Sequence, residues 1–266
     1  MQTVTSKDGT TIAYDQSGQG PALILIPGAF EQRAMPSDTS ALAVFPQLAE
    51  HFTVYHYDRR GRGDSTDTLP FALEREIEDI EALIDAAGGS AFVSGISSGA
   101  ALAFEATLAL NNKVKKLALY EPPYNDDPEA QQAWKKLRQD LPAPIAEGHN
   151  GDAVALFLMG MGVPEEVVEG MRQYEMWPMF EAIAPTLAYD AAALGDDQAV
   201  PVEKAARLGV PTLIMVGGET PYPFMSTTAQ ALAKAIPNAQ YRILEGEVHE
   251  VRPEAITPVL IEFFNS

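Results

Sequence analysis

The chain has 266 residues, of which 46% are hydrophobic, and this is enough apolar material for one large domain or one domain with an insertion. Lys and Arg number 18 and Asp and Glu number 37, so the formal net charge is −19, which disfavours binding to nucleic-acid phosphates or anionic lipid. The sequence has no cysteine, which excludes disulfides, thiolate metal sites and a cysteine nucleophile.

The sequence also shows no signal for a membrane or an export pathway. No apolar run approaches the roughly 18–20 residues that span a bilayer. Residues 1–9 lack the basic start and the apolar core of a secretion signal. We therefore expect a soluble, cytoplasmic protein whose partner is a small molecule rather than a nucleic acid or a membrane.

Short apolar runs alternate with helical stretches in the first half of the chain. The run at residues 22–26 is apolar throughout, as expected of a strand that is buried on both faces. Residues 73–84 and 100–106 are predicted helices, and the first of them repeats its apolar side chains at helical spacing. This alternation indicates βαβ units and a mostly parallel sheet. Strands are predicted at residues 11–14, 22–26, 53–57, 91–94 and 116–120.

The pattern changes from about residue 126 to residue 207, where no convincing strand is found. Strand-like runs return at residues 211–216 and 240–244, and a helical C-terminus follows. We therefore predict an α/β core from residues 1–123 and 208–266, with a helical cap at residues 124–207. Prolines interrupt the helical segments of this cap at Pro142, Pro144, Pro164, Pro178, Pro185 and Pro201.

The strongest local signal is Gly-Ile-Ser-Ser-Gly at residues 95–99, which follows an apolar strand and precedes an Ala-rich helix. This is the context of a G-x-S-x-G nucleophile elbow, in which the serine occupies a strained strand-to-helix turn. A side chain at Gly95 or Gly99 would collide with neighbouring backbone in such a turn. The amides at the start of the helix also favour negative charge beside Ser97. We interpret Ser97 as a nucleophile, and the alternative is a tight Gly/Ser loop.

A serine hydroxyl needs a base to remove its proton, and the sequence has four histidines. His51 ends a helix-like stretch, His56 lies in a predicted strand and His149 lies in a turn of the helical region. His249 follows the last predicted strand, and loops at the carboxyl edge of a parallel sheet can reach a residue on the elbow. His249 is therefore the predicted base. The histidines show no spacing with Asp or Glu that indicates a metal site.

Two further motifs are Ile-Pro-Gly-Ala-Phe at residues 26–30 and Asp-Arg-Arg-Gly-Arg-Gly-Asp-Ser at residues 58–65. They resemble the oxyanion-loop HG motif, with Pro27 in place of the usual histidine, and the D-x-R-G-x-G-x-S turn of the α/β-hydrolase family. The resemblance covers essentially the whole chain. It implies a mostly parallel twisted sheet flanked by helices, with a helical cap after the sixth strand. It also implies an oxyanion hole formed by the backbone amides of Ala29 and Ser98.

The acidic member of the triad departs from the pattern of this family. The family usually has an aspartate in the turn after the seventh strand, where this chain reads Gly-Gly-Glu-Thr-Pro at residues 217–221. Some haloalkane dehalogenases instead place a glutamate after the sixth strand, and this chain has Glu121 there, followed by two prolines. We favour Glu121 as the acid and keep Glu219 as the alternative. Either carboxylate would orient the imidazole of His249 without taking its proton.

The predicted cap is rich in methionine and aromatic residues, which are able to line an adaptable apolar pocket. The other interpretation is that these side chains only pack the cap helices against the core. The cap shows no basic cluster for a phosphate or carboxylate, so we expect a small-to-medium, partly apolar substrate. The candidate substrate-binding residues are Phe30, Met161, Met176 and Trp177.

These features predict a cofactor-free serine hydrolase that cleaves a carboxylic ester through an acyl-enzyme on Ser97. A lactonase or a perhydrolase of the haloperoxidase type would use the same triad with another substrate. A non-catalytic α/β-hydrolase homologue that binds a small ligand is a further alternative, supported by the missing acid in its usual slot and the missing oxyanion-loop histidine.

Overall fold

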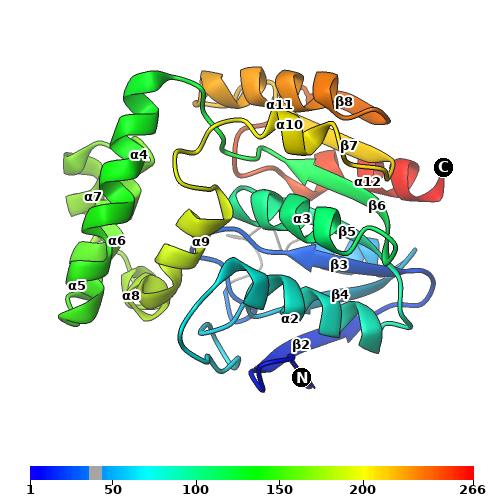
Figure 1. The fold of residues 1–266 in the computed structure, drawn as a ribbon, viewed down its shortest axis with the longest axis horizontal. Coiled ribbons are helices and arrows are strands. Elements are labelled where there is room, and N and C mark those ends of the chain that lie inside the picture. The colour runs from blue at the N-terminus through cyan, green and yellow to red at the C-terminus, as the bar shows by residue number, and fades with distance from the viewer. Residues whose placement is uncertain (36–43) are drawn as a thin grey trace.

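The computed structural model describes residues 1–35 and 44–266, and within them the central sheet has eight strands in the order β1-β2-β4-β3-β5-β6-β7-β8 (Figure 1). β1 pairs antiparallel with β2 and β2 with β4, whereas all pairs from β4 to β8 are parallel. The predicted α/β-hydrolase fold class is confirmed. The strands are β1 (Gln2–Thr5), β2 (Thr11–Ser17), β3 (Ala22–Ile26), β4 (Thr53–Tyr57), β5 (Ala91–Ile96), β6 (Val114–Tyr120), β7 (Thr212–Gly217) and β8 (Ala239–Leu244).

Helices cover both faces of the sheet because its central strands are apolar on both sides. In β3, Ile24 and Ile26 face the layer of α2 (Leu73–Ala86), α3 (Ser98–Ala109) and α11 (Pro223–Ala235). Leu23 and Leu25 alternate with them and face the opposite layer, which contains α1 (Phe45–Leu48) and α12 (Pro253–Asn265). This alternation follows from the two-residue period of a strand, and it buries β3 completely.

The segment between β6 and β7 is helical throughout its regular parts. Several of its prolines lie at or beside helix starts, where the missing amide hydrogen costs no hydrogen bond, so they separate short helices. Most of these helices gather at one side of the sheet, on the left in Figure 1, whereas α9 packs against α3 and α10 against α11. The helices are α4 (Pro128–Asp140), α5 (Pro142–Ala146), α6 (Asn150–Gly160), α7 (Glu165–Met171), α8 (Trp177–Ile183), the 3₁₀ helix η2 (Ala184–Thr186), α9 (Leu187–Ala193) and α10 (Val202–Ala205).

Two elements lie outside the predicted set. β1 is an edge strand whose side chains are mostly exposed, so its sequence lacks the apolar alternation on which strand prediction depends. α11 follows the turn after β7 and starts at a proline, and the sequence analysis assigned no helix there. The predicted strand at residues 11–14 extends through Ser17, and the other predicted strands agree with the structure within two residues.

His56 makes the stability of this fold dependent on pH. Its side chain lies in β4, is 6% exposed, and has a pKa lowered to about 4, mainly by burial and secondarily by the nearby Arg33, while Asp58 and Asp15 act in the opposite direction. The imidazole is therefore neutral in the fold down to about pH 4, whereas in the unfolded chain it takes up a proton near its ordinary pKa of 6.5. The free energy of unfolding thus falls as the pH drops from about 6.5 towards 4.

We expect this single group to remove up to about 3 kcal/mol of stability over that interval. Urea unfolding of the wild type and of His56→Gln between pH 7 and pH 4 measures it, and the variant should show the smaller loss. His149→Gln is the control, because the His149 side chain is 60% exposed. Equal pH dependence of wild type and His56→Gln would contradict this account.

Candidate active site

Ser97 occupies the turn between β5 and α3 with φ 55° and ψ −130°, a left-handed conformation that a serine adopts only where the surroundings impose it. Its amide donates a 3.0 Å hydrogen bond to the carbonyl of Tyr120 at the end of β6. Its carbonyl accepts a 2.9 Å hydrogen bond from the amide of Ala100 in α3. The backbone of the predicted nucleophile is thus held from two sides, by the sheet and by the helix.

The two glycines of the elbow are required by close backbone contacts. A Cβ atom on Gly95 would lie 2.4 Å from the carbonyl oxygen of Gly99. A Cβ atom on Gly99 would lie 2.4 Å from the carbonyl oxygen of Pro27, in the loop after β3. Both distances are far inside van der Waals contact and involve backbone, which cannot move aside as a flexible side chain does. The structure therefore has the crowding that a nucleophile elbow requires.

Glu121 and His249 are in direct contact. Glu121 directly follows β6 and is completely buried, and its Oε2 lies 2.6 Å from Nδ1 of His249. Oε1 of Glu121 accepts a 2.9 Å hydrogen bond from the amide of Gly217, and Oε2 accepts a 3.3 Å bond from the hydroxyl of Thr220. Glu121 also has a positive φ of 46°, so its backbone is strained while its carboxylate is fully hydrogen-bonded. The geometry is that of an acid which orients an imidazole.

Glu219, the alternative acid, has a different environment. The residue is exposed, and its amide donates a 2.9 Å hydrogen bond to the carbonyl of Glu247. The hydroxyl of its neighbour Thr220 donates to the Glu121 carboxylate. The structure brings Glu121, rather than Glu219, to His249.

Further residues hold the loop that carries His249, and the sequence analysis did not identify them. The hydroxyl of Tyr120 donates to the carbonyl of Val248. The Tyr222 ring meets the His249 ring edge to face, with centroids 5.9 Å apart. Tyr120 directly precedes Glu121, but nothing in the sequence indicates that its hydroxyl reaches a loop 128 residues away.

The loop after β3 supplies the predicted oxyanion residue Ala29. The carbonyl of Gly28 accepts a 2.8 Å hydrogen bond from Arg62, and the amide of Gly28 donates a 2.7 Å bond to the carboxylate of Glu31. Ser98, the other predicted donor, is the first residue of α3, where backbone amides have no partner within the helix. Ala29 borders the same cavity as Ser97 and His249.

This cavity has a volume of about 920 Å³ and lies between the sheet and the helices that follow β6. Three of the predicted substrate-binding residues line it: Phe30, Met161 and Met176. Trp177 is not part of the lining. Its side chain is buried within the helical segment, where Nε1 donates to Glu181 at 3.1 Å and the ring packs against Phe180. Additional apolar lining comes from Met171, Phe180, Tyr222 and Phe224, which the sequence analysis did not select for binding.

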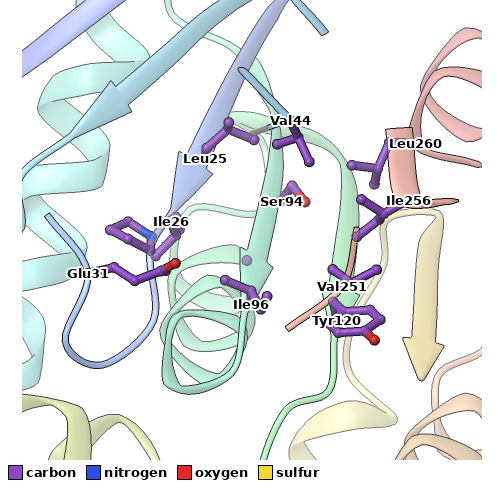
Figure 2. A pocket seen from close by; sticks show the side chains of 12 residues that line it. Leu25, Ile26, Glu31, Val44, Ser94, Ile96, Tyr120, Val251, Ile256 and Leu260 are labelled. Atoms are coloured by element: carbon purple, nitrogen blue, oxygen red, sulfur yellow. The ribbon is translucent and has the colours of Figure 1, made fainter. Parts of the chain in front are cut away.

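A second, much smaller cavity lies beside the elbow strand. Its volume is about 40 Å³, and Figure 2 shows Val251, Ile256 and Leu260 on one side of it and Leu25 on the other. Ser94 and Glu31 contribute polar side chains to a lining that is otherwise mostly apolar. This volume is too small for an organic substrate, so the larger cavity is the candidate binding site.

The described part of the chain has neither a candidate metal cluster nor a candidate membrane-spanning helix. No group of three or more His, Cys, Asp or Glu side chains in it is arranged to hold a metal ion. Likewise, no helix within residues 1–35 and 44–266 is long and apolar enough to cross a membrane.

Comparison with known proteins shows to which family the chain belongs. The sequence profile of the alpha/beta hydrolase family matches residues 23–256. The chain belongs to this family. An alpha/beta hydrolase from Sphaerobacter thermophilus DSM 20745 is 48% identical, with a TM-score of 0.86 over 99% of this chain and 100% of that chain.

Two other solved structures are similar over nearly their whole length. A hydrolase from Pseudomonas aeruginosa PA01 is 25% identical, with a TM-score of 0.74 over 100% of this chain and 98% of that chain. A thermophilic esterase from Thermogutta terrifontis is 21% identical, with a TM-score of 0.70 over 99% of this chain and 97% of that chain. The last similarity shows the fold alone. Family membership and the hydrolases from Sphaerobacter thermophilus and Pseudomonas aeruginosa support hydrolase activity for the chain.

The crowding at the elbow of this alpha/beta hydrolase predicts a strong effect of Gly99→Ala. The added methyl group would overlap backbone carbonyls, so we expect the free energy of unfolding to fall by about 1–3 kcal/mol or more. Gly170→Ala is the matched control, because Gly170 lies in helix α7 and a Cβ there meets no atom within 4 Å. Its stability should be unchanged or higher by about 0.5–1 kcal/mol. Urea unfolding measures both, and equal stabilities would disprove the crowding argument.

The contact between Glu121 and His249 predicts that Glu121→Gln lowers kcat for hydrolysis by about 10²–10⁴-fold, because the imidazole loses the charged group that it contacts. Glu219→Gln is the matched control and should leave kcat within about a factor of two, since an exposed carboxylate is weakly coupled to its surroundings. Steady-state kinetics of both variants measures the difference. A larger loss in Glu219→Gln than in Glu121→Gln would reverse the assignment.

Proposed function

We propose that this alpha/beta hydrolase is a cofactor-free serine hydrolase that cleaves a carboxylic ester of a small-to-medium, partly apolar substrate. One observation carries the proposal. The strained Ser97 and His249 line the same cavity, and His249 is held at 2.6 Å by the buried carboxylate of Glu121. A nucleophile, a base and an orienting acid on three strand ends are the requirements of the Ser-His-acid mechanism.

In the proposed reaction, Ser97 Oγ attacks the ester carbonyl carbon and His249 takes the hydroxyl proton. The amides of Ala29 and Ser98 donate to the oxyanion that forms on the carbonyl oxygen. The tetrahedral intermediate collapses, His249 returns the proton to the departing alcohol, and an acyl group remains on Ser97. His249 then removes a proton from water, which attacks the acyl carbonyl, and the acid is released with Ser97 regenerated.

The lining of the cavity supports the proposed substrate class. Phe30, Phe180 and the methionines Met161, Met171 and Met176 form apolar walls next to Ser97. Thioether side chains are flexible and polarisable, so they adapt to acyl groups of different shape. A volume of about 920 Å³ is ample for an ester of this size. We propose that the segment from α4 to α8, which supplies these side chains other than Phe30, forms the cap of the enzyme.

Intact-mass spectrometry with a fluorophosphonate tests the proposal. We expect one adduct on the wild type and none on Ser97→Ala, together with loss of hydrolysis of short p-nitrophenyl esters by about 10³-fold or more in the variant. Circular dichroism of both proteins controls for folding. A folded wild type that forms no adduct and hydrolyses no ester would reject the proposal and favour a ligand-binding homologue. Faster turnover of lactones than of open esters would retain the triad and replace the substrate class.

A further inference from the structure

Three arginines of the turn at residues 58–65 are completely or almost completely buried, although the proposed reaction gives them no role. Arg59, Arg60 and Arg62 are each at most 1% exposed. A buried guanidinium is costly unless carboxylates and further hydrogen bonds compensate it. Arg60 pairs with Asp79 and Asp8, away from the site, whereas Arg59 and Arg62 both pair with Asp190 in α9.

Arg62 connects Asp190 to the loop after β3. Its Nη2 pairs with Asp190, its Nη1 donates a 2.8 Å hydrogen bond to the carbonyl oxygen of Gly28, and its Nε donates a 2.9 Å bond to the hydroxyl of Thr186. The carbonyl of Gly28 and the amide of Ala29 belong to the same planar peptide unit. The C=O and N–H bonds of a trans peptide lie in this plane and point in opposite directions, so holding the oxygen fixes the direction in which the Ala29 N–H points.

Asp190 connects the same cluster to the start of α3. Its Oδ1 accepts a 2.7 Å hydrogen bond from the hydroxyl of Ser98, and it also accepts from Arg59. Ser98 is 3% exposed, so this bond lies in a buried environment. The amide of Ser98 is the second proposed oxyanion donor. The Arg62–Asp190 ion pair therefore contacts the peptide unit of the Ala29 amide through Arg62 and the side chain of Ser98 through Asp190.

We propose that Arg62 and Asp190 are positioning residues that set the two oxyanion-hole amides relative to each other. This inference rests on the proposed function, because it presupposes that Ala29 and Ser98 hold an oxyanion. The donors come from loops more than sixty residues apart in sequence, one after β3 and one after β5. The planar guanidinium of Arg62 contacts Gly28 through Nη1 and Asp190 through Nη2, and it sets their separation with more directional constraint than a single ammonium group would.

The charges of the cluster balance. Arg59 and Arg62 carry two positive charges, and Asp190 and Glu76 carry two negative ones, with Glu76 accepting from Arg59 at 2.7 and 2.8 Å. Burial raises the pKa of Asp190, but the adjacent Arg59 and Arg62 outweigh burial and hold it below its ordinary value. Asp190 therefore stays ionised, and its charge is neutralised locally, so it does not oppose negative charge developing in the oxyanion hole.

The experiment compares Arg62→Lys and Ser98→Ala with Arg60→Lys, all in the full-length protein. Arg60 belongs to the same turn and is equally buried, but its partners are Asp79, Asp8 and the carbonyl of Arg75. Arg60→Lys therefore controls for the loss of a buried guanidinium without a link to the oxyanion residues. Ser98→Ala removes only the hydroxyl that reaches Asp190 and keeps the backbone amide, so it decides the matter alone if Arg62→Lys fails to fold.

The readouts are kcat and KM for a p-nitrophenyl ester and the affinity for an aryl trifluoromethyl ketone, which forms a tetrahedral oxyanion on the serine. We expect Arg62→Lys and Ser98→Ala to lower kcat by about 10–100-fold with little change in KM, because displaced donors weaken the transition state selectively. The ketone should bind more weakly by a similar factor. Arg60→Lys should keep kcat and ketone affinity within about threefold of wild type, even where its stability falls.

Unchanged kcat and ketone affinity in Arg62→Lys and Ser98→Ala, with wild-type ester hydrolysis intact, would overturn the inference and leave the proposed function standing. A loss in Arg60→Lys equal to that in Arg62→Lys would also overturn it, because the effect would then be general destabilisation. A wild type that neither reacts with the fluorophosphonate nor hydrolyses the ester would remove the proposed function, and this inference with it.

Discussion

The close contact between the first turn of α3 and the loop after β3 is the constraint on which the whole site depends. A Cβ on Gly99 would lie 2.4 Å from the carbonyl oxygen of Pro27 and 2.5 Å from that of Ile26. Backbone approaching backbone this closely leaves no freedom for the helix to slide. Ser97 and Ser98 therefore have a fixed position relative to Ala29. Ser97 lies two residues before Gly99, has a positive φ of 55° and lines the cavity.

The sheet explains how the acid can follow β6 and still reach the usual position. β6 and β7 are neighbours in parallel register, with Tyr120 opposite Met215, and the amide of Glu121 donates to the carbonyl of Met215 at 3.0 Å. The residue after β6 thus lies beside the turn after β7, where Gly217 and Thr220 donate to its carboxylate. Thr220, in the turn where the family usually has the acid, donates a hydrogen bond to this carboxylate. The carboxylate beside the end of β7 is therefore that of Glu121, which follows the neighbouring strand β6.

The sequence predicted those features of the fold and the site that depend on a local pattern of residues. The buried strands, the helix after the elbow and the two glycines follow from periodicity and sterics within a few residues. Glu121 and His249 are 128 residues apart in the chain, and the order of motifs favoured Glu121 as the acid but left Glu219 open as the alternative. The burial of Arg59 and Arg62 could not be predicted, since arginines are usually exposed and Asp190 lies in a helix that the sequence assigned only to a cap. Trp177 was expected in the pocket because an aromatic residue in the sequence indicates a buried side chain but does not indicate which way that side chain points.

The buried ion cluster also divides the helices that follow β6 into two groups. Buried ion pairs add little net stability, yet removing one partner is strongly destabilising because an uncompensated charge is left behind. Moving α9 away from the sheet would remove Asp190 from Arg59, from Arg62 and from the hydroxyl of Ser98. These contacts therefore tie α9 to the core. Among the described ion pairs, the helices from α4 to α8 make none with Arg59, Arg62 or the residues of the elbow, so the cluster holds α9 to the core and leaves those helices to be held by packing.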